Sequence, residues 1–282
     1  MPGNFRFGTV GSPLSTPKKP GGSAGAVLRL AELELSALEL GWVQSVRVSP
    51  ETCQAIRQQA AGVDVAVSVH APYFINLNAS EEEWPHSRKR LVDAATYGAL
   101  AGATDIVFHP GSYFDHQPAE VLPAAIERLA GVAAELRQAG NPVTLRPETM
   151  GKVAMLGSLA DTLALSQAIP GVLPCLDFAH LHARAGDGSL NSRAEWIDLL
   201  HTYASALGPD ALHALHIHLS GIEYTVKGER NHLPLLESDF NLRGLFEALA
   251  ALGCAGRILC ESPKMEDDAI LMRDLWREIA GS

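Results

Sequence analysis

The chain has 282 residues, of which 47% are hydrophobic and 19% are charged, and its formal net charge at pH 7 is −10. A chain of this length can bury a large core, which suits one large α/β domain or two smaller ones. The acidic charge argues against a general nucleic-acid binder, because such proteins usually present a basic face. Bound divalent cations would offset much of that charge locally.

The cysteines and the hydropathy pattern limit the cellular setting. The chain has four cysteines with no paired C-x-x-C spacing, and its N-terminus has no secretory hydrophobic region. We therefore expect a reduced, cytoplasmic setting. No apolar run approaches the roughly 20 residues of a membrane-spanning helix, so we expect no membrane partner. Cys175 and Cys260 lie within apolar strand-like runs and are expected in the core.

Apolar strand-like runs alternate with helical patterns along the chain. The expected strands are residues 5–10, 37–43, 64–69, 105–108, 143–146, 172–176, 212–219 and 257–260. The expected helices are residues 24–35, 49–62, 81–101, 119–139, 158–171, 192–207, 241–252 and 266–280. Ser49 followed by Pro50, for example, is typical of an N-cap with proline at the first helical position.

Strict strand–helix alternation predicts a parallel sheet, and its eight repeats predict a closed (β/α)8 TIM barrel, a single α/β domain spanning residues 1–282. A doubly wound open sheet is the competing fold. That fold would concentrate functional residues at one crevice beside a topological switch point. Here polar residues follow six of the eight expected strands. Only a closed barrel brings six strand ends together around one mouth, so we favour the barrel.

These polar residues have the character of metal ligands. They are His70, His109, Glu148, Asp177 with His180, the pair His216 and His218, and Glu261, and Glu229 and His232 follow on an expected loop after the seventh strand. Imidazoles mixed with carboxylates, without thiolates, suit zinc, manganese or iron. A catalytic zinc ion takes about three protein ligands, so this number of donors indicates two or three ions. Paired ions about 4 Å apart can promote hydrolysis of a phosphoester.

Each candidate has an ordinary structural explanation as well. The chain has 11 histidines, and we expect surface or satisfied core positions for His86, His116, His201 and His213. Asp177 and His180 could form a helix cap after a strand, but in the company of the other residues they are interpreted as a metal-binding pair. Spacing does not separate His216 from His218. His218 lies nearer the carboxyl end of the strand and is the better candidate ligand.

Taken together, these motifs resemble the endonuclease IV family of apurinic/apyrimidinic (AP) endonucleases, within the broader group of xylose-isomerase-like barrels. The resemblance runs from the third expected strand to the eighth. The motifs are His70-Ala71-Pro72-Tyr73-Phe74-Ile75-Asn76-Leu77, Phe108-His109-Pro110-Gly111-Ser112, Pro147-Glu148-Thr149, Leu176-Asp177-Phe178-Ala179-His180, His218-Leu219-Ser220-Gly221 and Glu261. Each motif is weak alone, but six in this order at successive strand ends form a specific pattern.

The resemblance implies a centre of three zinc ions, with manganese as another possible metal. It implies that one ion is held by His70, His109 and Glu148, a second by Glu148, Asp177, His218 and Glu261, and a third by His180, Glu229 and His232. The implied activity is hydrolysis of the phosphodiester bond 5′ to an abasic site in double-stranded DNA during base excision repair, with Glu148 and Glu261 as catalytic metal ligands. Tyr73 and Phe74 would insert at the damaged site. We expect a monomer.

The sequence also departs from the family pattern. The segment Glu229-Arg230-Asn231-His232 stands where the family usually has Asp-x-His, and the first expected strand lacks the histidine common in bacterial members. Arg47 is a candidate DNA contact from its position alone. His182 and Arg184 are candidate phosphate contacts, and ordinary solvated loop positions are an equal alternative for both.

Two other function classes remain open. A sugar isomerase or epimerase on the same barrel needs one or two divalent ions and groups that transfer protons, and Glu148, Asp177, His218 and Glu261 could serve. The acidic net charge favours this enzyme, whereas the number of histidines and the Tyr73-Phe74 pair favour the nuclease. The second alternative is a metal-bearing DNA-binding protein without catalytic activity.

Overall fold

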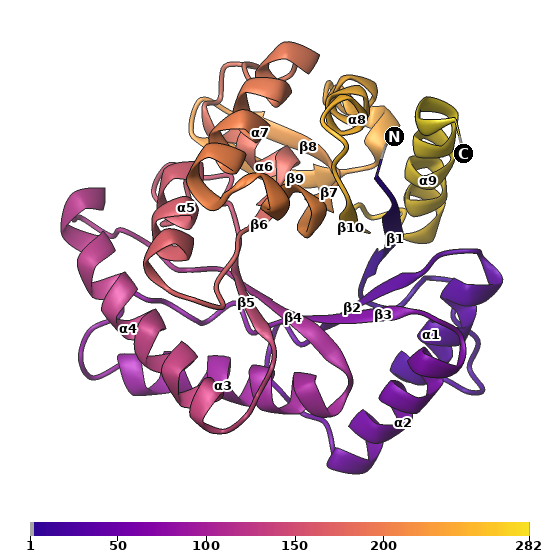
Figure 1. Cartoon of the computed structure of the whole chain (residues 1–282), viewed down its shortest axis with the longest axis horizontal. Coiled ribbons are helices and arrows are strands. Elements are labelled where there is room, and N and C mark those ends of the chain that lie inside the picture. The colour runs from indigo at the N-terminus through magenta and orange to yellow at the C-terminus, as the bar shows by residue number, and fades with distance from the viewer. Residues whose placement is uncertain (1–2, 282) are drawn as a thin grey trace.

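The computed structural model describes residues 3–281 and places eight parallel strands inside a ring of helices (Figure 1). The parallel strands are β1 (Phe5–Val10), β2 (Ala37–Gly41), β3 (Ala66–His70), β4 (Ala103–Phe108), β5 (Thr144–Pro147), β6 (Cys175–Asp177), β7 (Leu215–Leu219) and β10 (Gly256–Cys260). The surrounding helices are α1 (Gly22–Glu32), α2 (Pro50–Gly62), α3 (Trp84–Leu100), α4 (Pro118–Gln138), α5 (Leu159–Ala168), α6 (Phe178–Arg184), α7 (Arg193–Leu207), α8 (Leu242–Ala251) and α9 (Glu266–Ala280). In residues 3–281, no helix is long and apolar enough to cross a membrane.

The strands form one nearly closed barrel. Their order around the sheet is β5-β4-β3-β2-β1-β10-β7-β6. Isolated parallel bridges from Leu145 to Val172 and from Glu148 to Cys175 join the two ends of this sheet, and the Thr149 amide donates a 3.0 Å hydrogen bond to the Cys175 carbonyl. The predicted TIM barrel is therefore confirmed, because the open-sheet alternative would leave two unpaired edges.

Local sequence signals set several of the helix starts. Ser49 caps α2 by accepting a hydrogen bond from the Thr52 amide, with Pro50 next in the chain. Ser158 and Ser192 form capping boxes at the starts of α5 and α7. In each case a side-chain oxygen satisfies an amide that has no partner within the helix.

Two elements differ from the sequence prediction. The segment that carries Glu229 and His232 was expected as a loop, but it forms an antiparallel hairpin of β8 (Gly221–Thr225) and β9 (Gly228–Leu233). A bridge between Lys152 and Gly228 ties this hairpin to the loop after β5. The short helix α6 directly after Asp177 was not predicted as an element either. Both elements lie at the carboxyl ends of the strands, where they position polar side chains.

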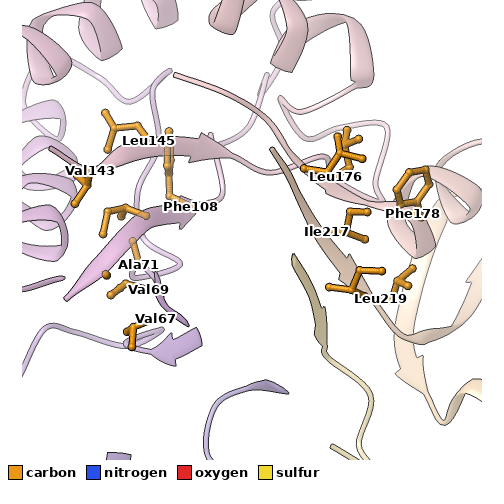
Figure 2. Packing of buried hydrophobic residues seen from close by; sticks show 14 of the residues in the cluster. Val67, Val69, Ala71, Phe108, Val143, Leu145, Leu176, Phe178, Ile217 and Leu219 are labelled. Carbon is orange, nitrogen blue, oxygen red and sulfur yellow. The ribbon is translucent and has the colours of Figure 1, made fainter. Parts of the chain in front are cut away.

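The main hydrophobic core lies between the barrel and its helices. Val67 and Val69 of β3 and Ile217 of β7 belong to this core cluster, part of which is drawn in Figure 2. Because side chains alternate along a strand, the residues between them point into the barrel. These inward positions are polar in β3 and β7: they hold Ser68 and His70 in β3, and His216 and His218 in β7.

Candidate metal centre

Polar side chains from six barrel strands meet at the carboxyl ends of those strands, which form the mouth of the barrel. His70, Asp177 and His218 lie at or near the ends of their strands, and His109, Glu148 and Glu261 come directly after theirs. The helix α6 and the β8–β9 hairpin add three more ligand candidates, His180, Glu229 and His232. This end of a TIM barrel is where functional residues gather.

Glu148 lies at the centre of this cluster, with its side chain fully buried. Its Oε2 atom is 3.2 Å from Nε2 of His70 and 3.3 Å from Nε2 of His109. Its Oε1 atom is 3.3 Å from Nδ1 of His218 and 3.5 Å from Nδ1 of His180. The two oxygens of one carboxylate thus face imidazoles on two sides, His70 and His109 on one and His218 on the other, with His180 farther away. A carboxylate in this position can bridge two metal ions.

The donors form three overlapping groups, in each of which the ligand atoms lie within 4.8 Å of one another. The groups are His70 with His109 and Glu148, then Glu148 with Asp177, His218 and Glu261, and finally Asp177 with His180 and His232. Glu148 belongs to the first two groups, and Asp177 belongs to the last two. These nitrogen and oxygen donor sets suit zinc, manganese or iron.

Asp177 is both a helix cap and a member of the cluster. Its Oδ1 atom accepts a 2.7 Å hydrogen bond from the His180 amide at the start of α6. Its Oδ2 atom is buried and has no hydrogen-bond partner among residues 3–281. Burial raises the pKa of Asp177 to about 6, and the charges of Glu148 and Glu261 act in the same direction. A buried carboxylate oxygen without a partner is costly, and a bound cation would remove that cost.

The third group brings two imidazoles unusually close together. Nδ1 of His180 donates a 3.0 Å hydrogen bond to the Thr149 carbonyl, and Nδ1 of His232 donates a 3.2 Å bond to the Glu261 carbonyl. Their Nε2 atoms then face each other at 3.1 Å. Two bare nitrogen lone pairs repel at that distance, so a proton or a metal ion is needed between them. This geometry fits a shared metal ion.

Glu229 enters the third group from the hairpin. Its Oε2 atom lies 3.6 Å from Nε2 of His180. The Glu229 amide donates a 2.9 Å hydrogen bond to the Gly151 carbonyl, which fixes the strand beside the loop after β5. A Cβ atom at Gly151 would lie 2.6 Å from the Cβ of Glu229. The absence of a side chain at Gly151 therefore lets Glu229 approach the mouth.

The charges in the cluster shift its pKa values in opposite directions. Burial alone would lower the pKa of His70, but its hydrogen bond to Glu148 and the charge of Glu148 raise that pKa to about 9. Burial also acts against the charged form of His180, yet Asp177 and Glu148 raise its pKa to about 9. In Glu148 itself, burial favours the neutral acid, but the surrounding histidines hold the pKa well below its usual range. The carboxylates therefore require positive charge close by.

The two predicted wedge residues lie at the rim of the mouth. Tyr73 is 47% exposed, and its ring stacks on that of His109 with 4.9 Å between the ring centroids. Phe74 is 56% exposed and carries the Arg90 guanidinium over its ring. Both side chains thus have the exposure that insertion into DNA requires. Arg47 is exposed in the loop after β2, and its role stays a prediction.

The expectation that His182 contacts phosphate was wrong. His182 is fully buried in α6, where Nδ1 contacts the Ser189 carbonyl at 2.9 Å and Nε2 lies 3.3 Å from Asp239. The Tyr224 ring of the hairpin packs against it edge-on. Its neighbour Arg184 donates hydrogen bonds to four backbone carbonyls between residues 150 and 155. Both side chains hold the loops together instead of facing the mouth.

One polar residue close to the cluster was not indicated by the sequence pattern. Glu39, in the middle of β2, is fully buried in the barrel interior and lies 3.0 Å from Nε2 of His218. The only sequence signal was an acid within the apolar run Ala37-Leu38-Glu39-Leu40. His216, which spacing could not separate from His218, donates a hydrogen bond to this carboxylate from Nε2. His218 is the one whose Nδ1 faces Glu148 and Glu261.

Relatives of this chain include proteins described as endonuclease 4. A protein of Methanocaldococcus jannaschii described as uncharacterized is 36% identical over 274 residues, which cover 97% of each chain. Endonuclease 4 of Thermus thermophilus is 33% identical over 177 residues, which cover 59% of this chain and 61% of that protein.

Solved structures show the same barrel. A crystal structure of endonuclease IV from Thermus thermophilus has a TM-score of 0.71 at 24% identity and covers 96% of this chain and 99% of that one. A D-tagatose 3-epimerase-like protein has a TM-score of 0.72 at 17% identity and covers 97% and 98%. At such identities the likeness shows the fold alone. A family model described as a xylose isomerase-like TIM barrel matches residues 27–279, so the chain belongs to that family of barrels.

Proposed function

We propose that this chain is a metal-dependent AP endonuclease that hydrolyses the phosphodiester bond 5′ to an abasic site in double-stranded DNA. The observation that carries the proposal is the position of Glu148, whose one oxygen faces His70 and His109 and whose other oxygen faces His218, while a third donor group lies next to these two. A cluster of this size exceeds what one ion needs. The relatives described as endonuclease 4 support the same reading.

In this proposal each donor group holds one ion, with zinc as the first candidate and manganese as the second. Glu148 is shared between the first two groups, and Glu229 joins His180 and His232 in the third. When bound, such ions activate a water molecule and stabilise the leaving oxygen of a phosphoester. Asp177, whose buried Oδ2 atom has no hydrogen-bond partner among the described residues, belongs to both the second and the third group.

The exposure of the ligands indicates where a phosphate enters. The side chains of Glu148 and His218 are fully buried. Those of His109, Glu261 and His232 are 20%, 13% and 25% exposed. The outer ligands therefore face the substrate, and the inner ones hold the geometry away from bulk water. Phosphoryl transfer depends mainly on such positioning and electrostatics.

The charge around the mouth is compatible with DNA despite the acidic net charge. The loops after β10, β1 and β2 lie next to one another in the barrel. They carry Lys264, Lys18, Lys19 and Arg47, all exposed. Acids lie beside these cations as well: Glu261 follows β10, and Glu266, Asp267 and Asp268 form the first turn of α9, where the Glu266 carboxylate accepts hydrogen bonds from the Leu14 and Ser15 amides. The four cations are therefore the groups on this side of the mouth that could contact a phosphate backbone. Tyr73 and Phe74, at the end of β3, would enter the duplex beside it.

A nicking assay tests the proposal. The metal-loaded protein is incubated with a duplex that bears one abasic analogue, and with the same duplex without it. We expect zinc-dependent cleavage 5′ to the analogue alone, nearly abolished in Glu261→Gln while circular dichroism shows an intact fold. Full activity in that variant contradicts the role of Glu261, and an uncut duplex contradicts the nuclease. Binding without cleavage indicates a DNA-binding protein without catalysis.

A sugar epimerase or isomerase is the second candidate. The group of Glu148, Asp177, His218 and Glu261 alone could hold one divalent ion next to groups that transfer protons. The structural likeness to a D-tagatose 3-epimerase-like protein, at 17% identity, shows that this candidate is compatible with the fold. Elemental analysis separates the two: about three zinc ions per chain favour the nuclease, and a single manganese or magnesium ion favours the sugar enzyme.

A further inference from the structure

A buried carboxylate lies in the barrel interior next to the candidate metal centre. Glu39 is 0% exposed, and its Oε2 atom accepts a 2.7 Å hydrogen bond from the Ser68 hydroxyl and a 2.9 Å bond from Nε2 of His216. Its other oxygen, Oε1, lies 3.0 Å from Nε2 of His218. These partners come from β3 and β7, so Glu39 connects separate strands across the interior of the barrel.

The contact between Glu39 and His218 compensates for the loss of hydration of two buried polar atoms. Neither Oε1 of Glu39 nor Nε2 of His218 has a well-aligned hydrogen bond within the described part of the chain, so their 3.0 Å contact is mainly electrostatic. Both atoms are fully buried. A buried carboxylate oxygen and a buried ring nitrogen each lose hydration, which makes this contact the interaction that compensates both.

Glu39 lies behind the ring nitrogen of His218 that would carry the proton if the imidazole bound a metal ion. Without an ion, carboxylates face both nitrogens: Oε1 of Glu39 lies 3.0 Å from Nε2, and Nδ1 lies 3.3 Å from Glu148 and 3.4 Å from Glu261. An ion on Nδ1, the nitrogen that faces the mouth, would leave the ring proton on Nε2. The ionised Glu39 carboxylate beside Nε2 would then favour this tautomer and fix the orientation of the ring.

Three other imidazoles of the cluster are held differently. The rear nitrogens of His70, His180 and His232 donate to the backbone carbonyls of Ala71, Thr149 and Glu261. Those acceptors are neutral, whereas the one behind His218 is a carboxylate. A carboxylate behind a ligand histidine makes the imidazole a more basic donor and adds negative charge near the ion.

We propose that Glu39 is a positioning residue that raises the affinity of the second donor group for its ion by holding His218. The inference rests on the proposed metal centre, but its test does not depend on DNA cleavage. Ser68 and His216 support the role, because their hydrogen bonds to Oε2 fix the carboxylate and leave Oε1 for His218.

The test is a zinc titration of the metal-free protein against a chromophoric chelator. Glu39→Gln keeps the size of the side chain but removes its charge, and we expect one site to lose affinity by about 10- to 100-fold. Glu39→Asp, which restores the charge, should recover part of the loss. Glu127→Gln, an exposed position on α4, is the matched control. Zinc affinity in Glu39→Gln within twofold of the wild type, with an intact fold by circular dichroism, overturns the proposal.

A spectroscopic readout separates positioning from general stability. In protein with ¹⁵N-labelled histidine, long-range ¹H–¹⁵N correlations report which ring nitrogen of His218 carries the proton. We expect a single Nε2–H tautomer in the zinc-loaded wild type and a mixture or a shifted signal in Glu39→Gln. An identical His218 signal in both proteins contradicts the proposal.

A metal ion bound inside the barrel, beside Glu39, would also contradict the positioning role of Glu39. Cys175, His216 and His218 also present ligand atoms within 4.8 Å of one another. An extra zinc ion in the wild type that is lost in both Cys175→Ser and Glu39→Gln would make Glu39 a ligand itself. Lower zinc affinity in Glu39→Gln, together with a wild type that leaves abasic DNA uncut, would uphold the positioning role and reject only the nuclease.

Discussion

The two ends of the barrel handle buried charge in opposite ways. At the amino-terminal end, Asp105 forms ion pairs with Arg146 at 2.7 Å and with Arg257 at 2.9 Å. Other donors of these arginines bond to backbone carbonyls and to the Thr104 hydroxyl. At the carboxyl-terminal mouth, carboxylates and imidazoles crowd together, and Asp177 Oδ2 has no partner among the described residues.

This difference separates an end whose buried charges are paired from an end whose buried donors are suited to cations. At the amino-terminal end the charges of Asp105 and the two arginines compensate each other, so no bound ion is needed there. The mouth holds acceptors and lone pairs that point at each other, which is stable only with protons or cations between them. Most of the polar residues at both ends are buried, so burial alone does not distinguish the two ends. The two ends differ in whether each buried charge and each hydrogen-bonding atom has a partner.

The largest effect is expected from Glu148→Gln at the mouth. This change removes one charge and one donor from two groups at once, so we expect activity on abasic DNA to fall by at least about 10³-fold. Bound zinc should fall by more than one ion per chain by elemental analysis. Glu127→Gln on the outer surface of α4 should change neither quantity. Retention of the full zinc content in Glu148→Gln would show that the groups do not share this residue.

Asp105→Ala should break the opposite end of the barrel. It leaves the buried Arg146 and the largely buried Arg257 without their carboxylate, and such losses cost about 3–5 kcal/mol of unfolding free energy. We expect a large drop in the melting temperature by calorimetry, with unchanged zinc affinity in protein kept well below that temperature. A loss of zinc affinity with little loss of stability would mean that the two ends are not independent.

These two ends also show how far sequence reasoning reaches. The barrel was predictable because the strand–helix alternation is regular, and the gathering of polar side chains at its mouth was predictable because they follow strand ends. Glu39 was missed because its partner His216 lies 177 positions further along, so no local pattern reveals the contact. His182 was assigned wrongly because its burial depends on the Tyr224 side chain of an unpredicted hairpin.

The pH dependence of the metal-free protein should reveal the protons at the mouth. The pKa values of His70 and His180 are about 9 in the folded chain, above the ordinary value of 6.5. Their protonated forms therefore add stability that is complete below pH 6.5 and is lost as the pH rises through about 9. Asp105, whose pKa is held far below its usual range, stays charged throughout this window.

Zinc should reverse this trend, because zinc binds the bare nitrogens that the protons occupy. We expect the melting temperature of the metal-free protein to fall between pH 6.5 and pH 8.5, and the increase produced by zinc to grow over the same interval. Differential scanning calorimetry at constant ionic strength measures both. A metal-free melting temperature that stays constant over this range would show that the mouth carries no excess protons.

The smallest effect should come from the rim, where Tyr73 packs on the rings of His70 and His109 but neither Tyr73 nor Phe74 supplies an atom to the donor groups. Replacing both by Ala leaves the donor groups intact, so zinc content and melting temperature should stay near those of the wild type. Stacking of an aromatic ring on a base contributes about 1–3 kcal/mol, and a missing base lowers the cost of opening the helix. We therefore expect about 10-fold weaker binding of an abasic duplex and a smaller loss on the intact duplex. Fluorescence anisotropy with both duplexes in parallel measures the difference. Equal losses of affinity for the two duplexes would show that Tyr73 and Phe74 contact DNA in general. Recognition of the abasic site would then depend on the metal centre.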